Sequence, residues 1–172
     1  FATDPDDRAT LAVVSGLRRQ GKTYLLHALT EALGGLYFEA APATERESLR
    51  LFGAAIGRRI GAGVQLDFET WQDGVDYLFS LASNRSGLVV IDEFPQLAKT
   101  SPRLLALLRR ELAASAQSRR GRSRLILCGA ATPVMHRLLD RTGVLAGQTD
   151  LDLLVRPLDY RDAARFWNLT DP

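Results

Sequence analysis

Short apolar runs recur along the chain and are separated by longer stretches in which apolar residues follow a helical spacing. The runs are rich in aliphatic and aromatic side chains, which is typical of buried strands, and they lie at residues 10–14, 36–39, 88–91, 125–128 and 151–155. The run at 88–91 is apolar throughout rather than alternating, as expected for a parallel strand that is covered on both faces.

The stretches between the runs predict amphipathic helices. In residues 22–33, four leucines fall on one helical face, and the glycine pair at 34–35 ends the helix. Similar spacing predicts further helices at residues 48–60, 70–81, 102–116, 132–139 and 160–167. Strands that alternate with helices predict one α/β domain with a parallel sheet between two helical layers.

Composition agrees with this fold class. The chain has 172 residues, of which 46% are hydrophobic and 24% charged, which suits a soluble globular domain. No apolar run approaches the ~18 residues that span a bilayer, and the start shows no secretory pattern. We therefore expect a cytoplasmic protein with no membrane partner.

The segment from Gly16 to Thr23 fits the pattern G-x-x-x-x-G-K-[ST] between a predicted strand and a predicted helix. Glycines at 16 and 21 permit backbone conformations in which successive N–H groups converge on phosphate oxygens. Lys22 would reach the β- and γ-phosphates, and the Thr23 hydroxyl would bind Mg²⁺. Only two of the 22 basic residues are lysines, and one of them is Lys22, whose compact ammonium fits between phosphate oxygens.

A second motif places two acids at the end of the apolar run at 88–91. Asp92 and Glu93 would lie at the carboxyl edge of the sheet, where open α/β sheets bind ligands. Asp92 would hold Mg²⁺ through a bound water, and Glu93 would act as the general base that polarises the attacking water. Neighbouring side chains of an extended chain point in opposite directions, so the two acids would serve different partners.

The two motifs, with the Phe94-Pro95 extension of the second, resemble those of archaeal-type ATPases of the AAA+/STAND branch of P-loop NTPases. Segments 125–129 and 156–164 resemble later landmarks of the same family. The resemblance implies a three-layer α/β/α core with a five-stranded parallel sheet in the order 5-1-4-3-2. The strand at 125–128 would then separate the phosphate-binding strand from the Asp92 strand.

The resemblance also implies a division of the chain and a set of site residues. Residues 1–156 would form the ATPase core, and residues 157–172 would begin a helical lid that continues, with effector domains, in a longer protein. ATP and Mg²⁺ are the expected ligands. The expected nucleotide-binding residues are Gly16, Arg18, Arg19, Gln20, Gly21, Lys22, Thr23, Tyr24 and Thr132; the metal ligands are Thr23 and Asp92; the catalytic residues are Glu93, Lys22 and Arg141.

The sequence departs from the family pattern at two places. A polar sensor residue usually follows the fourth strand, but here Ala130 and Ala131 come first and Thr132 is the first polar side chain. Thr132 would either contact the γ-phosphate or cap the helix that begins at Pro133, and the cap is favoured. Gln148 stands where the family often has arginine, so Arg141 or Arg137 would have to supply that charge, within the chain or across a subunit interface.

The remaining polar and reactive residues add little chemistry. Arginines at 109–110 and 119–124 are interpreted as a solvated helix end and loop, with contact to nucleic acid or a partner subunit as the alternative; the net charge of +2 does not imply a nucleic-acid partner. His27 and His136 have no ligand neighbours at metal spacing and are interpreted as structural. Cys128 is interpreted as an inert buried thiol.

Two main functions compete. The first is an ATP hydrolase whose nucleotide state drives a switch, which the adjacent acids at 92 and 93 favour. The second is a nucleotide-gated interaction module with little or no hydrolysis, which Ala130, Ala131 and Gln148 favour. A small-molecule kinase is a third option, but Glu93 argues against it because a water-activating base favours hydrolysis over transfer. A homo-oligomer is compatible with either main function.

Overall fold

The computed structural model describes residues 10–61, 63–84, 87–118, 123–139, 143 and 145–167. Within these residues the sheet has five strands, each of which lies at a predicted apolar run. They are β1 (Thr10–Gly16), β2 (Leu36–Glu39), β3 (Gly87–Asp92), β4 (Ser123–Ala130) and β5 (Thr149–Val155). All the pairings are parallel and the strand order is β2-β3-β4-β1-β5. The predicted order is therefore confirmed, with β4 between β1 and β3.

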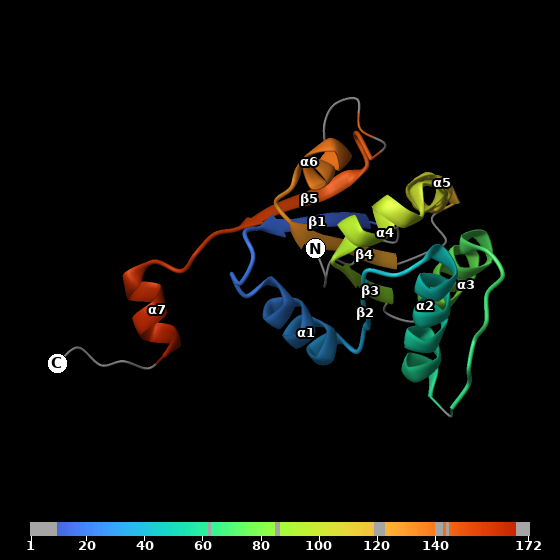
Figure 1. The fold of residues 1–172 in the computed structure, drawn as a ribbon, viewed down its shortest axis with the longest axis horizontal. Coiled ribbons are helices and arrows are strands. Elements are labelled where there is room, and N and C mark those ends of the chain that lie inside the picture. Colours follow the sequence, from blue (N-terminus) through green and yellow to red (C-terminus); the bar gives the residue numbers. More distant parts are fainter. Residues whose placement is uncertain are drawn as a thin grey trace.

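Helices connect the strands and cover the two faces of the sheet unequally (Figure 1). They are α1 (Lys22–Leu33), α2 (Glu45–Ile60), α3 (Trp71–Asn84), α4 (Phe94–Thr100), α5 (Pro102–Ser118), α6 (Pro133–Leu139) and α7 (Tyr160–Phe166). One face of the sheet packs against α2 to α6, and α1 packs against the other. The helix α7 extends away from this core and buries none of its residues.

Local signals explain the end of α1 and the start of α2. The helix α1 ends at Gly34, which adopts the left-handed conformation that glycine tolerates best (φ 65°). The helix α2 begins three residues earlier than its apolar spacing predicts, because Thr44 caps it by accepting a hydrogen bond from the N–H of Glu47. The pair Thr44 and Glu47 has the spacing of a capping box, a signal that the sequence already contained.

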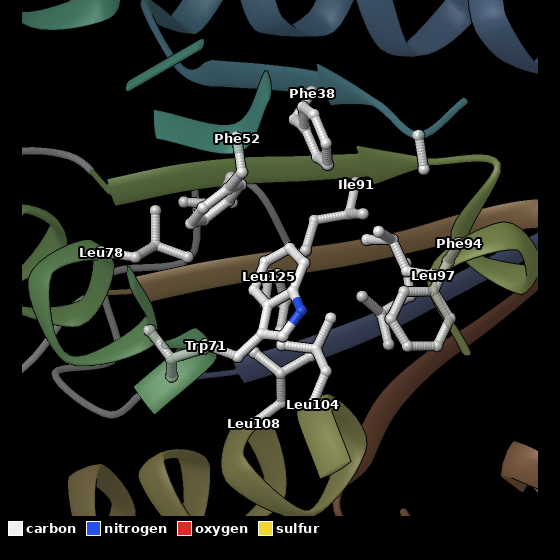
Figure 2. Close-up of a cluster of buried hydrophobic side chains, with 14 of the residues drawn as sticks. Phe38, Phe52, Trp71, Leu78, Ile91, Phe94, Leu97, Leu104, Leu108 and Leu125 are labelled. Carbon is white, nitrogen blue, oxygen red and sulfur yellow. The ribbon is translucent and has the colours of Figure 1, made fainter. Parts of the chain in front are cut away.

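The helix α4 was not predicted. The segment 94–100 is short and contains Pro95, so it carries no extended apolar periodicity. Tertiary packing stabilises it instead: Phe94 and Leu97 are buried and point into the larger core cluster (Figure 2). This cluster also takes side chains from β2, β3, β4 and the helices α2, α3 and α5, including Trp71, whose indole N–H donates to Ser101 Oγ at 2.8 Å.

The charged side chain of Arg124 corrects another expectation. It was assigned to a solvated arginine-rich loop, but β4 begins at Ser123, and the strand leaves Arg124 only 4% exposed. Residues 119–122 of that loop lie outside the described residues. Arg109 and Arg110 are exposed, as predicted, but they lie in the middle of α5 and not at a helix end. No helix among the described residues combines the length and the apolarity that crossing a membrane would need.

Two helical glycines offer a matched test of the packing. A Cβ built on Gly57 of α2 would lie 2.0 Å from the carbonyl oxygen of Val64, whereas one on Gly74 of α3 would meet its nearest neighbour, Phe52, at an ordinary 3.4 Å. We expect Gly57→Ala to lower the free energy of unfolding by about 1–3 kcal/mol because the backbone must shift. Gly74→Ala should raise it by about 0.5–1 kcal/mol because alanine favours the helix. Urea unfolding of both variants measures the difference, and equal effects would contradict this packing.

Candidate functional site

The loop between β1 and α1 lies at the carboxyl edge of the sheet. Gly16 passes so close to β5 that a Cβ there would lie 2.4 Å from the carbonyl oxygen of Val155, so a larger residue would displace one of the two strands. Arg19 (φ 64°) and Gly21 (φ 82°) adopt left-handed conformations that turn the chain into the helix. The Leu17 N–H donates to Gln20 Oε1 at 3.0 Å, which closes the loop. The N-terminus of α1 follows, and its unpaired N–H groups and positive dipole end favour anions.

Lys22 is folded into this loop. Its side chain is buried, and its ammonium donates to the carbonyl oxygens of Leu17 at 2.7 Å and Gly16 at 3.2 Å. Two carbonyl acceptors on the loop backbone compensate for the cost of burying the ammonium without a carboxylate partner. The same contacts hold a positive charge against the loop that would receive the phosphates.

The carboxylate of Asp92 is the most highly connected group of the site. It lies at the end of β3 and is 1% exposed. Thr23 Oγ1 donates to Oδ2 at 2.8 Å, Tyr37 OH donates to the same oxygen at 2.7 Å, and the Glu93 N–H donates to Oδ1 at 2.8 Å. The first helix, the second strand and the third strand are therefore joined at one carboxylate.

These donors decide the ionisation of Asp92. Burial acts to raise the pKa of this carboxyl, but hydrogen bonds from Tyr37, Cys128, Thr23 and the Glu93 backbone outweigh it and hold the pKa below its ordinary value. Burial and the neighbouring carboxylate raise the pKa values of Tyr37 and Cys128 well above their usual ranges. Both groups therefore stay protonated and remain donors at neutral pH, which agrees with the interpretation of Cys128 as an inert thiol.

The sequence predicts Asp92 and Glu93 on one extended chain, but Glu93 does not continue the strand. It adopts a left-handed conformation (φ 51°) at the N-terminal cap of α4, and its carbonyl oxygen accepts from the Gln96 N–H at 2.9 Å. A non-glycine residue in this conformation is uncommon and costs free energy. The packing of Phe94 and Leu97 in the core fixes the turn and so determines where the Glu93 side chain, which is half-buried, can point.

The other predicted site residues have no contact with Asp92 among the hydrogen bonds identified, or lie outside the described residues. Arg18 and Tyr24 are exposed near the start of α1. The favoured capping role of Thr132 is wrong, because its Oγ1 is buried without a hydrogen-bond partner while α6 begins at Pro133. Arg137 is exposed on α6, and Arg141 lies outside the described residues.

The inference drawn from Gln148 needs correction. β5 runs parallel to β1, with Thr149 beside Leu11 and Val155 beside Gly16. Gln148 therefore lies at the amino edge of the sheet, on the opposite side from the loop at 16–23. The glutamine there removes no charge from the candidate site of its own chain.

Sequence reasoning missed two residues at the carboxyl edge. Tyr37 was assigned only to a strand, and nothing in its local pattern indicates a hydroxyl that reaches Asp92. Arg156 follows β5 directly, and the pairing of Val155 with Gly16 places it at the edge that carries the phosphate-type loop. Its position after a predicted strand was the available signal, but the strand order had to be known first.

The oxygen atoms around Asp92 are of the kind that a magnesium ion prefers. Mg²⁺ prefers hard oxygen ligands and typically takes one or two protein carboxylates together with waters and substrate phosphates. A hydroxyl and a carboxylate oxygen 2.8 Å apart, beside a loop of phosphate-binding type, fit such a site. The described residues contain no group of three or more His, Cys, Asp or Glu side chains placed to hold a metal without a substrate.

Comparison with known proteins gives the fold its name. No family model matches the chain. The Walker-type ATPase of Pyrococcus abyssi superposes with a TM-score of 0.67 at 20% identity over 94% of this chain. The ORC2 protein of Aeropyrum pernix, solved with ADPNP and ADP, gives 0.64 at 19% identity over 93%. The AAA domain of FIGL-1 in complex with ADP gives 0.56 at 16% over 92%.

The chain thus has the fold of a P-loop ATPase of the AAA+ type. It is also 26% identical over 156 residues to an uncharacterized protein of Methanocaldococcus jannaschii. The match covers 90% of this chain but 33% of that protein, and the chain spans 55%, 45% and 47% of the three solved chains. The similarity therefore concerns only a part of each of these longer chains.

The lowered pKa of Asp92 predicts how stability depends on pH. Between its folded pKa and its ordinary value of 3.8, the unfolded chain binds more protons than the folded chain, so stability rises with pH. The contribution is complete above that ordinary value and is lost as the pH falls through the folded pKa. We expect Asp92→Asn to lack this term, so that the difference in unfolding free energy between wild type and variant shrinks from about pH 6 to about pH 3. Urea unfolding at several pH values measures it, and a constant difference would contradict the assignment.

Proposed function

We propose that the chain binds ATP with Mg²⁺ at the carboxyl edge of its sheet and hydrolyses it, with the nucleotide state acting as a switch. The observation that carries the proposal is the 2.8 Å contact between Thr23 Oγ1 and Asp92 Oδ2. It joins two motifs that lie 69 residues apart, in the arrangement that a bound magnesium triphosphate requires.

The roles follow from the chemistry of each group. The backbone of Arg19, Gln20 and Gly21 and the N-terminus of α1 would cradle the phosphates, and Lys22 would neutralise their charge. Thr23 and Asp92 would hold Mg²⁺, which when bound neutralises charge on the phosphates. Arg18, Tyr24 and Thr132 would contact the nucleotide, and Arg141 would supply a further positive charge; these remain proposals.

Glu93 would orient and deprotonate the attacking water. Its half-buried position at the start of α4 supports this role, because the turn separates its side chain from the buried Asp92 carboxylate. A base with its own orientation can act on water while Asp92 serves the metal. The strained backbone at Glu93 is consistent with a residue held for function rather than for stability.

The competing function is a nucleotide-gated interaction module with little hydrolysis. The observation in its favour is the absence of a polar side chain at Ala130 and Ala131, the positions directly at the end of β4. Turnover near background with tight ATP binding would favour this second function.

We also propose that residues 157–172 begin a separate lid, with effector domains in a longer protein. The absence of buried residues on α7 supports this division from the core at 1–156. A cytoplasmic location and a homo-oligomer are parts of the same proposal. The exposed Arg109 and Arg110 belong to the arginine-rich stretch that would contact a nucleic-acid partner; residues 119–122 of that stretch lie outside the described residues.

Two substitutions separate binding from hydrolysis. Lys22→Ala should weaken ATP binding by about 10–100-fold, because a charge-assisted contact contributes about 1.5–3 kcal/mol. Glu93→Gln should keep ATP binding and lower phosphate release by about 10²–10⁴-fold. Lys99→Ala is the matched control, since Lys99 is the other lysine of the chain and is exposed on α4.

Titration with a fluorescent ATP analogue and a phosphate-release assay give both readouts. Equal ATP affinity of the Lys22 and Lys99 variants would contradict the proposed phosphate-binding site. Unchanged phosphate release by Glu93→Gln would remove the assigned base, and background release by the wild type would favour the interaction module.

A further inference from the structure

The hydroxyl of Tyr37 has no part in the roles described so far, although it lies at the centre of the site. It comes from β2, the edge strand beside β3, and donates to Asp92 Oδ2 at 2.7 Å. Thr23 Oγ1 donates to the same oxygen at 2.8 Å, so two donors from different elements share one acceptor. If the proposed function holds, the two donors differ in their roles, because the Thr23 oxygen is expected to bind the metal and the Tyr37 oxygen is not.

We propose that Tyr37 is a positioning residue for magnesium: its hydroxyl holds the Asp92 carboxylate in the orientation that serves the metal, while the Thr23 oxygen binds the metal through its lone pairs. This inference rests on the proposed function and names a residue that acts through Asp92 rather than on the substrate. It assigns to β2 a part in metal binding that no local sequence signal indicates.

The burial of Asp92 explains why a second donor matters. The carboxylate is 1% exposed, so water cannot readily replace a lost hydrogen bond. A buried oxygen left without a donor costs about 1–3 kcal/mol, or more when it is charged. Tyr37 gives Oδ2 a donor that takes no part in binding the metal. Without it, the hydrogen bonds from Thr23, Cys128 and the Glu93 backbone would have to hold the carboxylate, and its orientation would be less well fixed.

The ring of Tyr37 is itself held in position. His27 of α1 stacks on it with a centroid separation of 3.8 Å and an interplanar angle of 28°. Thr23 and His27 lie four residues apart on the same helix, so α1 contacts both the acid and the tyrosine that supports it. The stacked rings restrict the direction in which the hydroxyl points.

The decisive measurement is the Mg²⁺ dependence of nucleotide binding, not activity. A fluorescent ATP analogue is titrated at fixed Mg²⁺ concentrations and in EDTA, with wild type, Tyr37→Phe and Tyr77→Phe. Tyr77 on α3 is the control because its ring packs against Phe68. Loss of a group that orients a metal ligand typically costs about 10–100-fold in metal affinity. We expect the Mg²⁺ concentration for half-saturation to rise about 10-fold in Tyr37→Phe, with binding in EDTA unchanged and Tyr77→Phe like wild type.

Other outcomes have clear meanings. A half-saturation concentration in Tyr37→Phe that is equal to or below that of the wild type overturns the inference, even if the melting temperature falls, because a merely structural role would affect stability alone. If Tyr37→Phe does not fold, His27→Ala decides, since it keeps the hydroxyl and removes the stacked ring: a rise of about 3-fold or more supports the inference and no rise overturns it. The Mg²⁺ dependence of the wild type is measured first. If its nucleotide binding does not depend on Mg²⁺, the proposed function itself is refuted.

Discussion

The burial of one carboxylate determines how this domain is assembled. Asp92 must remain ionised at a position that is 1% exposed. The fold meets that demand with hydrogen-bond donors on α1, β2 and β4 and with the backbone N–H of Glu93. Each donor fixes the position of an element: Thr23 ties the start of α1 to β3, and Tyr37 ties the edge strand to the same point. A buried charge with several directed hydrogen bonds tolerates few alternative arrangements, so the site and the fold specify each other.

The strands could be predicted because their signal is local. A buried parallel strand needs an apolar run, and the runs at 36–39 and 125–128 fall within or match β2 and β4. The strand order came from the resemblance and not from the runs themselves, because pairing is set by contacts between distant residues. The helix α4 was missed for a related reason: Phe94 and Leu97 are helical because the core receives their side chains, not because seven residues with a proline favour a helix.

Some residues of the candidate site could likewise be predicted from the sequence, and others could not. The loop at 16–23 and the acids at 92 and 93 have spacings dictated by chemistry, so they were found in the sequence. Tyr37 acts through a hydrogen bond across 55 residues and leaves no such pattern. Gln148 shows the opposite error, since its place in a family pattern suggested a phosphate contact that strand direction alone rules out within one chain. Register had to be known before either residue could be assigned.

The unequal layers of the fold indicate how the site could be coupled to α7. The face that holds α2 to α6 carries the larger core, whereas the opposite face is covered by α1, whose exposed surface includes Tyr24 and Leu25. Tyr24 contacts Phe166 of the otherwise unburied α7, with ring centroids 6.3 Å apart. The helix that supplies Lys22 and Thr23 therefore also contacts the segment that leaves the core. A shift of α1 on nucleotide binding would reach α7 through that one aromatic contact, because few other interactions of α7 would oppose it.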